Sequence, residues 1–429
     1  MKKLLFSATA LAMCLSHAYA GEIPLKGGKK GTPKKNLLRE VPNVLVTGNT
    51  STEQIEDSAA PFKPSIQLGA IVHMYASYEQ GGYGPGYTSS SEDWGKGFSL
   101  YRSRVLVGGQ LSKKGSFFFE TDLPKIIGSQ GATGKNVEVS QIVLDCQYEH
   151  KFAEAFQVIA GKQLVSNNRN GLQGAASLMA NDFTFWQYSN NMFSSSPLQN
   201  NYGRDLGVNF RGLLLKSKLE YRLGFFTGRN IDGKAPLRTV GRLVYNFLDA
   251  DKNFYYSGTN LGVGKTISLG AGFDAQATYS SYDVDLFVDV PITTAGSITF
   301  NGAYQYQTGG TNTTSKYSFA SLIPNQNVLF GELGYYFKSL KIQPWLRYEN
   351  QTVSAANEQL QGWTDKDLFN KAHTSTIFGG GINYFFNGYG TNLRLSYVTF
   401  TKGVGTGVDQ PVENKTFGST WLQLQFFFF

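Results

Sequence analysis

Cysteine and long apolar runs are both scarce in this chain of 429 residues. Its two cysteines are too few for a disulfide framework or a multi-cysteine zinc site, so both classes are excluded. The mean hydropathy of −0.24 excludes a bundle of membrane helices, which needs several apolar stretches of about 18 residues or more. Charged residues make up only 16% of the chain, whereas aromatic residues make up 14%, and this composition favours β-structure.

The first twenty residues have the pattern of a secretory signal. Two lysines precede a short apolar core over residues 4–15, and residues 18–20 read Ala-Tyr-Ala, which is a small-x-small cleavage site. The apolar core is too short to span a bilayer as an anchor. We therefore expect residues 1–20 to be a signal peptide. Cys146 is then the single remaining cysteine, so the exported protein has no internal disulfide.

The formal charge of +8 is concentrated near the N-terminus. Two excess positive charges leave with the signal, and five more lie in residues 21–39, where six basic residues accompany one acidic residue. Residues 40–429 are close to neutral. We interpret residues 21–64 as a flexible basic extension, with a solvated linker favoured over an arm that binds an anionic surface. A nucleic-acid partner is not expected.

From about residue 65 the sequence alternates with period two. The runs 206–211, 218–225 and 392–397 place apolar and polar residues at alternate positions. Successive side chains of a strand point to opposite faces, so this alternation indicates strands, and no comparable window repeats at the helical period. The pattern predicts about sixteen strands, near 66–78, 98–111, 115–122, 138–149, 155–164, 204–212, 217–228, 237–247, 265–276, 279–290, 296–307, 328–338, 341–351, 374–387, 389–401 and 419–429.

The connections between these strands are alternately short and long. Tight turns are expected at 113–114, 214–215, 339–340 and 388, and long loops at 79–97, 165–203, 308–327 and 352–373. Short turns at one end and long loops at the other are typical of outer-membrane barrels, and are not expected of a soluble sandwich or propeller. Tyrosines near the strand ends fit interfacial girdles: Tyr75, Tyr78, Tyr101, Tyr148, Tyr221, Tyr335, Tyr348 and Tyr397.

These features predict an all-β fold, a transmembrane antiparallel β-barrel of about sixteen strands over residues 65–429 that follows the basic extension. The expected location is the outer membrane of a Gram-negative type of cell, reached through the periplasm, with outer-membrane lipid as a partner. The last predicted strand ends the chain on Phe429, and a terminal aromatic residue resembles the signal that the barrel-assembly machinery reads. Leu422, Leu424, Phe426 and Phe428 form the cleaner lipid-facing set, which leaves Phe429 off that parity.

Charged side chains are expected to face the interior of the barrel, because the apolar positions face lipid. The basic candidates are Arg102, Arg104, Arg211, Lys218, Arg222, Arg238, Arg242, Arg347 and Arg394. The acidic candidates are Glu120, Asp122, Asp145, Glu220, Asp283, Asp285, Asp289 and Glu349. Four of the arginines fall on three consecutive strands over residues 204–247 and would form a basic wall that favours anions. Ion pairs like those of a protein surface are the alternative.

The longest loop, over residues 165–203, is long enough to be functional. It contains Arg169, Asp182 and Trp186 and leads into Arg204. We favour a constriction that folds into the interior over an exposed surface loop.

No catalytic constellation is predicted. His73, His150 and His373 lie on separate predicted strands or strand ends without the spacing of a zinc site or a triad, so no metal and no cofactor are expected. The run Gly264-Lys265-Thr266 lacks the earlier glycine of a phosphate-binding loop, because position 259 is Thr259, and a strand rather than a helix follows. We therefore expect no enzyme.

Several stretches, taken in order, resemble the phosphate-selective porins O and P. They are residues 101–105 (Tyr-Arg-Ser-Arg-Val), 203–208 (Gly-Arg-Asp-Leu-Gly-Val), 241–246 (Gly-Arg-Leu-Val-Tyr-Asn) and 283–291 (Asp-Val-Asp-Leu-Phe-Val-Asp-Val-Pro). The resemblance implies a sixteen-stranded homotrimeric channel with inward-folded loops and an anion preference through an arginine ladder. By position, the ladder members would be Arg102, Arg104, Arg211, Arg222 and Arg242. The lysine cluster of the family has no counterpart that can be placed on this chain.

The expected function is passive diffusion of small solutes through a water-filled channel that leans toward anions, phosphate-type anions included. A general or solute-specific porin for sugars, amides or peptides is the first alternative, with Phe183, Phe185 and Trp186 as an aromatic track. A non-conducting barrel that serves as a surface adhesin or structural protein is the second.

Overall fold

In the computed structural model the described residues are 62–83, 91–122, 126–127, 136–137, 142–187, 203–228, 234–310, 316, 319, 323, 325–353, 375–404 and 413–429. Contacts divide the chain into two units, Met1–Val41 and Pro42–Phe429, and every described residue belongs to the second. The expected signal peptide, most of the basic extension and His373 lie outside the described residues. Among these residues no helix is long and apolar enough to cross a membrane.

The described chain is built almost entirely of strands. They are β1 (Ser65–Gln80), β2 (Trp94–Gln110), β3 (Gly115–Asp122), β4 (Ile126–Ile127), β5 (Asn136–Val137), β6 (Ile142–Ala153), β7 (Phe156–Leu164), β8 (Arg204–Leu214), β9 (Leu219–Phe226), β10 (Arg238–Asn246), β11 (Thr266–Gln276), β12 (Tyr279–Thr293), β13 (Gly296–Thr308), β14 (Gln326–Phe337), β15 (Ile342–Val353), β16 (Ser375–Asn387), β17 (Thr391–Val404) and β18 (Glu413–Phe428). Sixteen of them are long, and each overlaps one predicted strand, so the predicted strands are confirmed.

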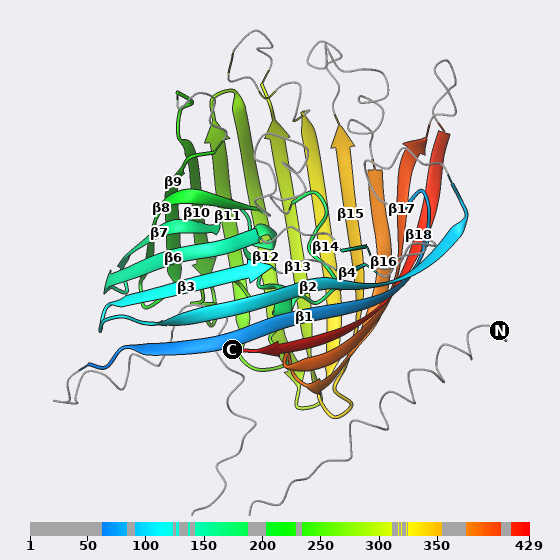
Figure 1. The fold of residues 1–429 in the computed structure, drawn as a ribbon, viewed down its shortest axis with the longest axis horizontal. Coiled ribbons are helices and arrows are strands. Elements are labelled where there is room, and N and C mark those ends of the chain that lie inside the picture. The colour runs from blue at the N-terminus through cyan, green and yellow to red at the C-terminus, as the bar shows by residue number, and fades with distance from the viewer. Residues whose placement is uncertain are drawn as a thin grey trace, which may run out of the picture. The chain divides into compact units, whose positions relative to one another are not determined.

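The sixteen long strands close into an antiparallel barrel. Each strand pairs with its neighbour in sequence, except that β3 pairs with β6 around the two-residue strands β4 and β5. The ring closes where β18 pairs with β1 over ten residues, from Ala70 opposite Phe428 to Glu79 opposite Ser419. Figure 1 shows β1, β2, β3 and β6 crossing obliquely in front of the steeper β12–β16. Closure matters because every long strand then has a neighbour on both sides, unlike the edge strands of an open sheet.

The outside of the barrel is apolar and the inside is polar. Along β15, for example, Leu346 and Tyr348 are exposed on the outside, whereas Arg347 and Glu349 are buried within. Exposed aromatic residues flank the short turns (Phe152, Phe156, Phe337, Phe386), and a second set lies toward the long loops (Tyr78, Tyr282, Tyr304, Phe378). An apolar band between two aromatic rows is the exterior that a lipid bilayer requires.

Two tyrosines predicted for the girdles are instead inside the barrel. Tyr75 is only 4% exposed, and the Tyr101 hydroxyl donates to Asp182. A register shift between His73 and Met74, opposite residues 100–102 of β2, changes which residues of β2 face inward. A bulge of this kind cannot be located from alternation alone, which explains why Tyr101 was assigned to the outside.

The alternation of short and long connections fails in one region. The connection 277–278, at the end of the barrel where the long loops lie, has only two residues between β11 and β12. At the opposite end, where the other turns are short, residues 247–265 form a long connection between β10 and β11. The inward turn of this second connection was not predicted from the sequence.

In the C-terminal strand β18, alternate residues face outward and inward as the sequence predicts. Phe426 and Phe428 are exposed on the outside, and Gln423 and Gln425 are fully buried inside. Phe429 lies off the lipid-facing set because it faces inward, where its ring meets Phe118 edge to face at 5.9 Å between centroids. The pairing of β18 with β1 shows no register shift, so no bulge is needed to explain this position.

An arginine at Leu346 tests which face of β15 meets lipid. We expect Leu346→Arg to lower the free energy of unfolding in lipid vesicles by about 2–4 kcal/mol, because a charge on the lipid face of a barrel is costly. Leu340→Arg, at an exposed position in the turn before β15, is the matched control and should change it by less than about 1 kcal/mol. Urea titrations would measure both, and equal effects would contradict the assignment of faces.

Candidate functional site: the arginine-lined interior

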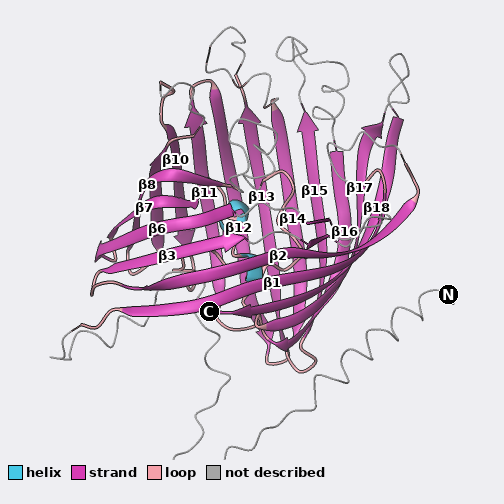
Figure 2. Ribbon diagram, viewed as in Figure 1, coloured by secondary structure: helices cyan, strands magenta, loops and turns pink. Residues whose placement is uncertain are grey.

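Two connections fold into the barrel and are buried there. The first inward segment, residues 165–187, follows β7 directly. It contains the short 3-10 turns η2 (Asn170–Leu172) and η3 (Ala175–Ser177). The second inward segment, residues 250–262, belongs to the long connection between β10 and β11. Ala176, Ser177 and Phe254 are all 0% exposed. Figure 2 shows the two short helical turns in cyan amid the strands.

Glycines on the wall make room for the first inward segment. A Cβ at Gly272 of β11 would overlap the carbonyl oxygen of Asn167, and one at Gly334 of β14 would overlap the sulfur of Met179. Because glycine has no Cβ, the backbone of Asn167 and the side chain of Met179 can lie close to the wall at these two positions. Any larger residue there would push them away.

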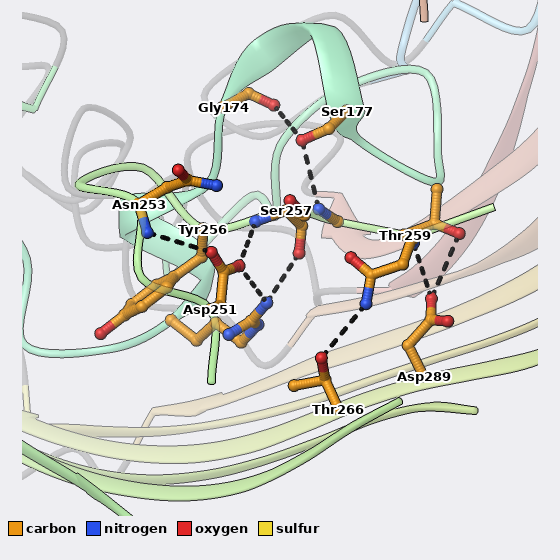
Figure 3. A network of polar contacts seen from close by, with 12 residues as sticks. Gly174, Ser177, Asp251, Asn253, Tyr256, Ser257, Thr259, Thr266 and Asp289 are labelled. Carbon is orange, nitrogen blue, oxygen red and sulfur yellow. Dashed lines mark hydrogen bonds and ion pairs between the residues drawn. The ribbon is translucent and has the colours of Figure 1, made fainter. Parts of the chain in front are cut away.

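The two inward segments are bonded to each other. A parallel bridge joins Gln173 to Tyr256: the Tyr256 amide donates to the Leu172 carbonyl at 2.8 Å, and the Gly174 amide donates to the Tyr256 carbonyl at 3.0 Å. The Gly258 amide donates to the Ser177 hydroxyl at 3.2 Å. Figure 3 shows part of this junction, where the hydroxyl of Ser177 contacts the second segment beside Ser257. The segments therefore behave as one packed unit inside the ring.

Arg169 lies at the centre of this unit. Its Nη2 donates to the carbonyl of Ser257 at 2.8 Å and to Asp251 at 3.3 Å, and its guanidinium lies 3.6 Å from the ring centroid of Phe287. Burial lowers the pKa of Arg169 from its ordinary value. Because Asp251 also accepts the Ser257 amide, one carboxylate orients both the arginine and the second inward segment (Figure 3).

The predicted basic wall over residues 204–247 is paired with acids and backbone oxygens. Arg211 and Arg222 share one carboxylate oxygen of Glu220, each at 2.8 Å. Their remaining donors hold carbonyls of the second inward segment: Arg211 bonds Lys252 and Asn253, and Arg222 bonds Asn253 and Phe254, at 2.7–3.3 Å. These arginines therefore anchor a backbone.

Arg238 and Arg242 complete the wall, and both are paired with carboxylates. Arg238 pairs with Asp274 at 2.5 Å and with Asp205 at 3.4 Å. Arg242 contacts Asp285 through both terminal nitrogens, at 2.5 and 2.8 Å, and also donates to the carbonyl of Asn167 in the first inward segment. Asp283 lies farther from Arg242, at 3.9 Å.

A second charged cluster forms on the neighbouring wall. Arg104 pairs with Glu120 at 3.0 Å and with Asp122 at 3.3 Å. Arg204 pairs with Glu120 at 3.3 Å and with Asp145 at 3.0 Å. All five side chains are buried, so the cluster is a closed ion-pair network rather than a set of free charges.

Three further arginines hold the first inward segment. Arg347 pairs with Glu332 and donates to the carbonyls of Asp182 and Phe183 at 2.7 and 3.0 Å. Arg394 donates to the carbonyls of Ala176 and Ala180 at 3.3 and 2.9 Å. Arg102 pairs with the Asp182 carboxylate at 2.5 Å. Burial opposes ionisation of Asp182, but Arg102 and the Tyr101 hydroxyl hold the pKa of this carboxyl below its usual range.

The remaining predicted site residues have distinct places. Lys218 lies outside the strands, in the turn 215–218, where its Nζ donates to the carbonyls of Phe247 and Leu248. Its prediction as an interior strand residue is therefore wrong, because β9 begins one residue later. Asp289 accepts the Asn260 amide at 2.8 Å, and Glu349 accepts the Phe185 amide at 2.7 Å. Trp186 packs against Val328, Ile377 and Phe400.

Sequence reasoning missed the second inward segment and three buried acids. Asp205, Asp274 and Glu332 each pair with an arginine that the sequence analysis had named. The run Asn253-Phe254-Tyr255-Tyr256 was the available signal, since three aromatic residues in a connection between two predicted strands call for a buried environment. Among the described residues, ten arginines and one lysine are buried together with twelve carboxylates, so the interior is nearly balanced in charge.

No protein-family profile matches the sequence, and no curated protein matches it. Solved structures with a similar fold include OprB of Pseudomonas putida, at 10% identity and a TM-score of 0.54 over 85% of this chain and 94% of that chain. The outer membrane channel DcaP of Acinetobacter baumannii matches at 12% identity and a TM-score of 0.51, over 86% of this chain and all of that chain. These similarities establish the barrel fold. Among the described residues, no group of three His, Cys, Asp or Glu side chains is placed to bind a metal.

The Arg242–Asp285 pair tests whether the charged interior holds the structure together. We expect Arg242→Met to lower the free energy of unfolding by about 3–5 kcal/mol, because it leaves a buried carboxylate unpaired. The double variant Arg242→Met/Asp285→Leu should recover at least about half of that loss. Urea titrations of the reconstituted barrel would measure both.

Lys415→Met is the control for that comparison, because Lys415 pairs with Glu92 on the exposed rim. Its effect should stay below about 1 kcal/mol. A loss of similar size in Arg242→Met and Lys415→Met would contradict a structural role for the interior pairs.

Proposed function

We propose that this chain is an outer-membrane porin through which small solutes diffuse passively. The observation that carries the proposal is the combination of a closed barrel, an apolar exterior and an interior lined with charged and amide side chains. In a barrel that spans a membrane, a polar interior provides the path that water and solutes need. Homotrimeric assembly and recognition of the C-terminal strand, with Phe429, by the barrel-assembly machinery are further predictions within this proposal.

The inward segments set the conductance in this proposal, because they occupy the space that a solute would cross. Their hold on the wall depends on close approach at Gly272, where a methyl group would overlap the backbone of Asn167. Overpacking of this kind costs about 1–3 kcal/mol. A cost of that size shifts the ratio of released to docked segment by about 5- to 150-fold.

We therefore expect Gly272→Ala to raise the single-channel conductance, or the fraction of time spent open, in planar bilayers. Gly331→Ala is the matched control, because an added Cβ at Gly331 of β14 would meet no atom within 4 Å, and its conductance should equal that of the unaltered protein. Equal conductance in Gly272→Ala and Gly331→Ala would show that the docked segments do not limit flow.

An anion preference is the finer part of the proposal. The carboxylates beside most arginines weaken the field that these arginines project, so we propose a weak preference. It rests on Arg394, whose hydrogen bonds all go to uncharged oxygens: two carbonyls and the side-chain amides of Asn392 and Gln425. The same site would serve chloride and phosphate-type anions.

The reversal potential under a potassium chloride gradient, and then a potassium phosphate gradient, tests this preference. We expect a small shift toward the anion equilibrium potential, and we expect Arg394→Gln to remove it. Lys341→Gln, in an exposed turn, should leave the shift unchanged. A reversal potential on the cation side in the unaltered protein would refute the preference and leave the porin proposal standing.

A non-conducting barrel with an adhesive or structural role is the second candidate. The observation that favours it is the dense packing of the interior, where both inward segments are buried and bonded to the wall. Single-channel recording separates the two candidates. Stepwise conductance from purified protein supports the porin, and a silent bilayer with both the unaltered protein and Gly272→Ala supports the non-conducting barrel.

A further inference from the structure

Five neighbouring strands each contribute one hydrogen-bond donor to the backbone of the first inward segment. In the order β15, β16, β17, β18 and β1, these donors are Arg347, Asn383, Arg394, Gln425 and Tyr75. They hold the carbonyl oxygens of residue 176 and residues 179–183 at 2.7–3.3 Å. We call this row of side chains the carbonyl track.

The carbonyl track recognises main chain rather than side chains. Every one of these bonds ends on a peptide carbonyl, so the identity of the residue that carries the carbonyl is not read. The donors also lie more than 100 residues away in sequence from the carbonyls that they hold, so the contacts are not a local feature of one turn. Donors on successive strands in this arrangement fit a short stretch of chain that turns several of its carbonyl oxygens toward the wall.

The chemistry of the track favours carbonyl and carboxylate oxygens over hydroxyl groups. The acceptor atoms of its two amides are already used: Asn383 Oδ1 accepts the Trp345 indole at 3.2 Å, and Gln425 Oε1 accepts Arg394 at 3.2 Å. The track therefore presents mainly N–H donors, which pair best with carbonyl and carboxylate oxygens, and it offers few acceptors to the hydrogens of sugar hydroxyl groups. A terminal carboxylate would be well placed against Arg394, because charge-assisted bonds to a guanidinium are strong.

We propose that the carbonyl track is a binding site for short peptides, and that the first inward segment occupies it as an internal stand-in for such a ligand. This inference rests on the proposed function, since a peptide reaches the track through the channel. The segment is tethered beside the track and competes at a high effective concentration. Loosening the segment without touching the track should therefore strengthen peptide binding.

Calorimetric titration of the full chain with trialanine tests the site directly. Gly272→Ala weakens the competitor but lies on β11, away from the track. We expect Gly272→Ala to bind trialanine about 5- to 150-fold more tightly than the unaltered protein does, the range that a coupling of 1–3 kcal/mol allows. Sucrose, a neutral polyol, should not compete. Equal affinity in both proteins, or equal binding of sucrose, would overturn the proposal.

Two asparagine variants on the Gly272→Ala background locate the peptide. Asn383→Leu removes one donor of the track and should weaken trialanine binding by roughly 3- to 10-fold. Asn246→Leu is the matched control, because Asn246 is also buried but donates to the carbonyl of Ser217, outside the track and outside both inward segments. Its affinity should stay within about twofold of the background. Weakening by both variants alike would place the peptide elsewhere and overturn the proposal.

Two further measurements keep the result unambiguous. If Asn383→Leu does not fold, as judged by its heat-dependent mobility on gels, Arg394→Lys replaces it, since a lysine keeps the charge but loses the two-pronged donor. Bilayer recording is carried out separately. Conductance without trialanine binding would refute this site and leave the porin standing, and trialanine binding without conductance would refute the porin and leave the site standing.

Discussion

The bond between a buried guanidinium and a backbone carbonyl is the interaction on which the interior of this barrel depends. A guanidinium carries five N–H donors, and a single carboxylate satisfies only some of them. In this chain the inward segments supply the rest: Arg222 bonds Glu220 and then Phe254 and Asn253, and Arg347 bonds Glu332 and then Asp182 and Phe183. The segments satisfy these remaining donors, and the arginines in turn hold the segments, together with neighbouring amide, tyrosine and carboxylate side chains.

Because the interior arginines are engaged in this way, they do not act as a ladder of free positive charges. A ladder of free positive charges would attract anions along the whole wall, but here carboxylates stand beside most of the guanidinium groups and the total charge is nearly balanced. The overall basic balance of the chain lies in the sequence before the barrel. In a channel of this kind, solute selectivity depends on which hydrogen-bond donors of the wall become accessible when an inward segment moves away from them. On β15 to β1 those donors suit carbonyl and carboxylate oxygens.

The sequence was sufficient to predict the sixteen strands and, for most of them, which residues face inward. Alternation with period two is a local property that can be read within each short run of residues. The inward position of Arg102, Arg211 and Arg394 follows from the same alternation. Their partners do not, because Arg394 meets the Ala176 carbonyl from 218 residues away and local patterns carry no information on such pairs. The bulge beside Tyr101 and the inward turn of residues 250–262 were missed for the same reason, although the aromatic run at 254–256 was a usable hint.

Hydrogen exchange at four backbone amides tests the central claim, which is that the two segments are held in the interior. The amides of Arg169, Phe185, Tyr256 and Asn260 donate to Asp285, Glu349, Leu172 and Asp289, respectively, at 2.7–3.1 Å. In the full chain reconstituted in lipid, we expect these four amides to exchange as slowly as amides of the surrounding strands. Exchange at the rate of an exposed loop would contradict the claim that arginine and carboxylate contacts hold the segments inside the barrel.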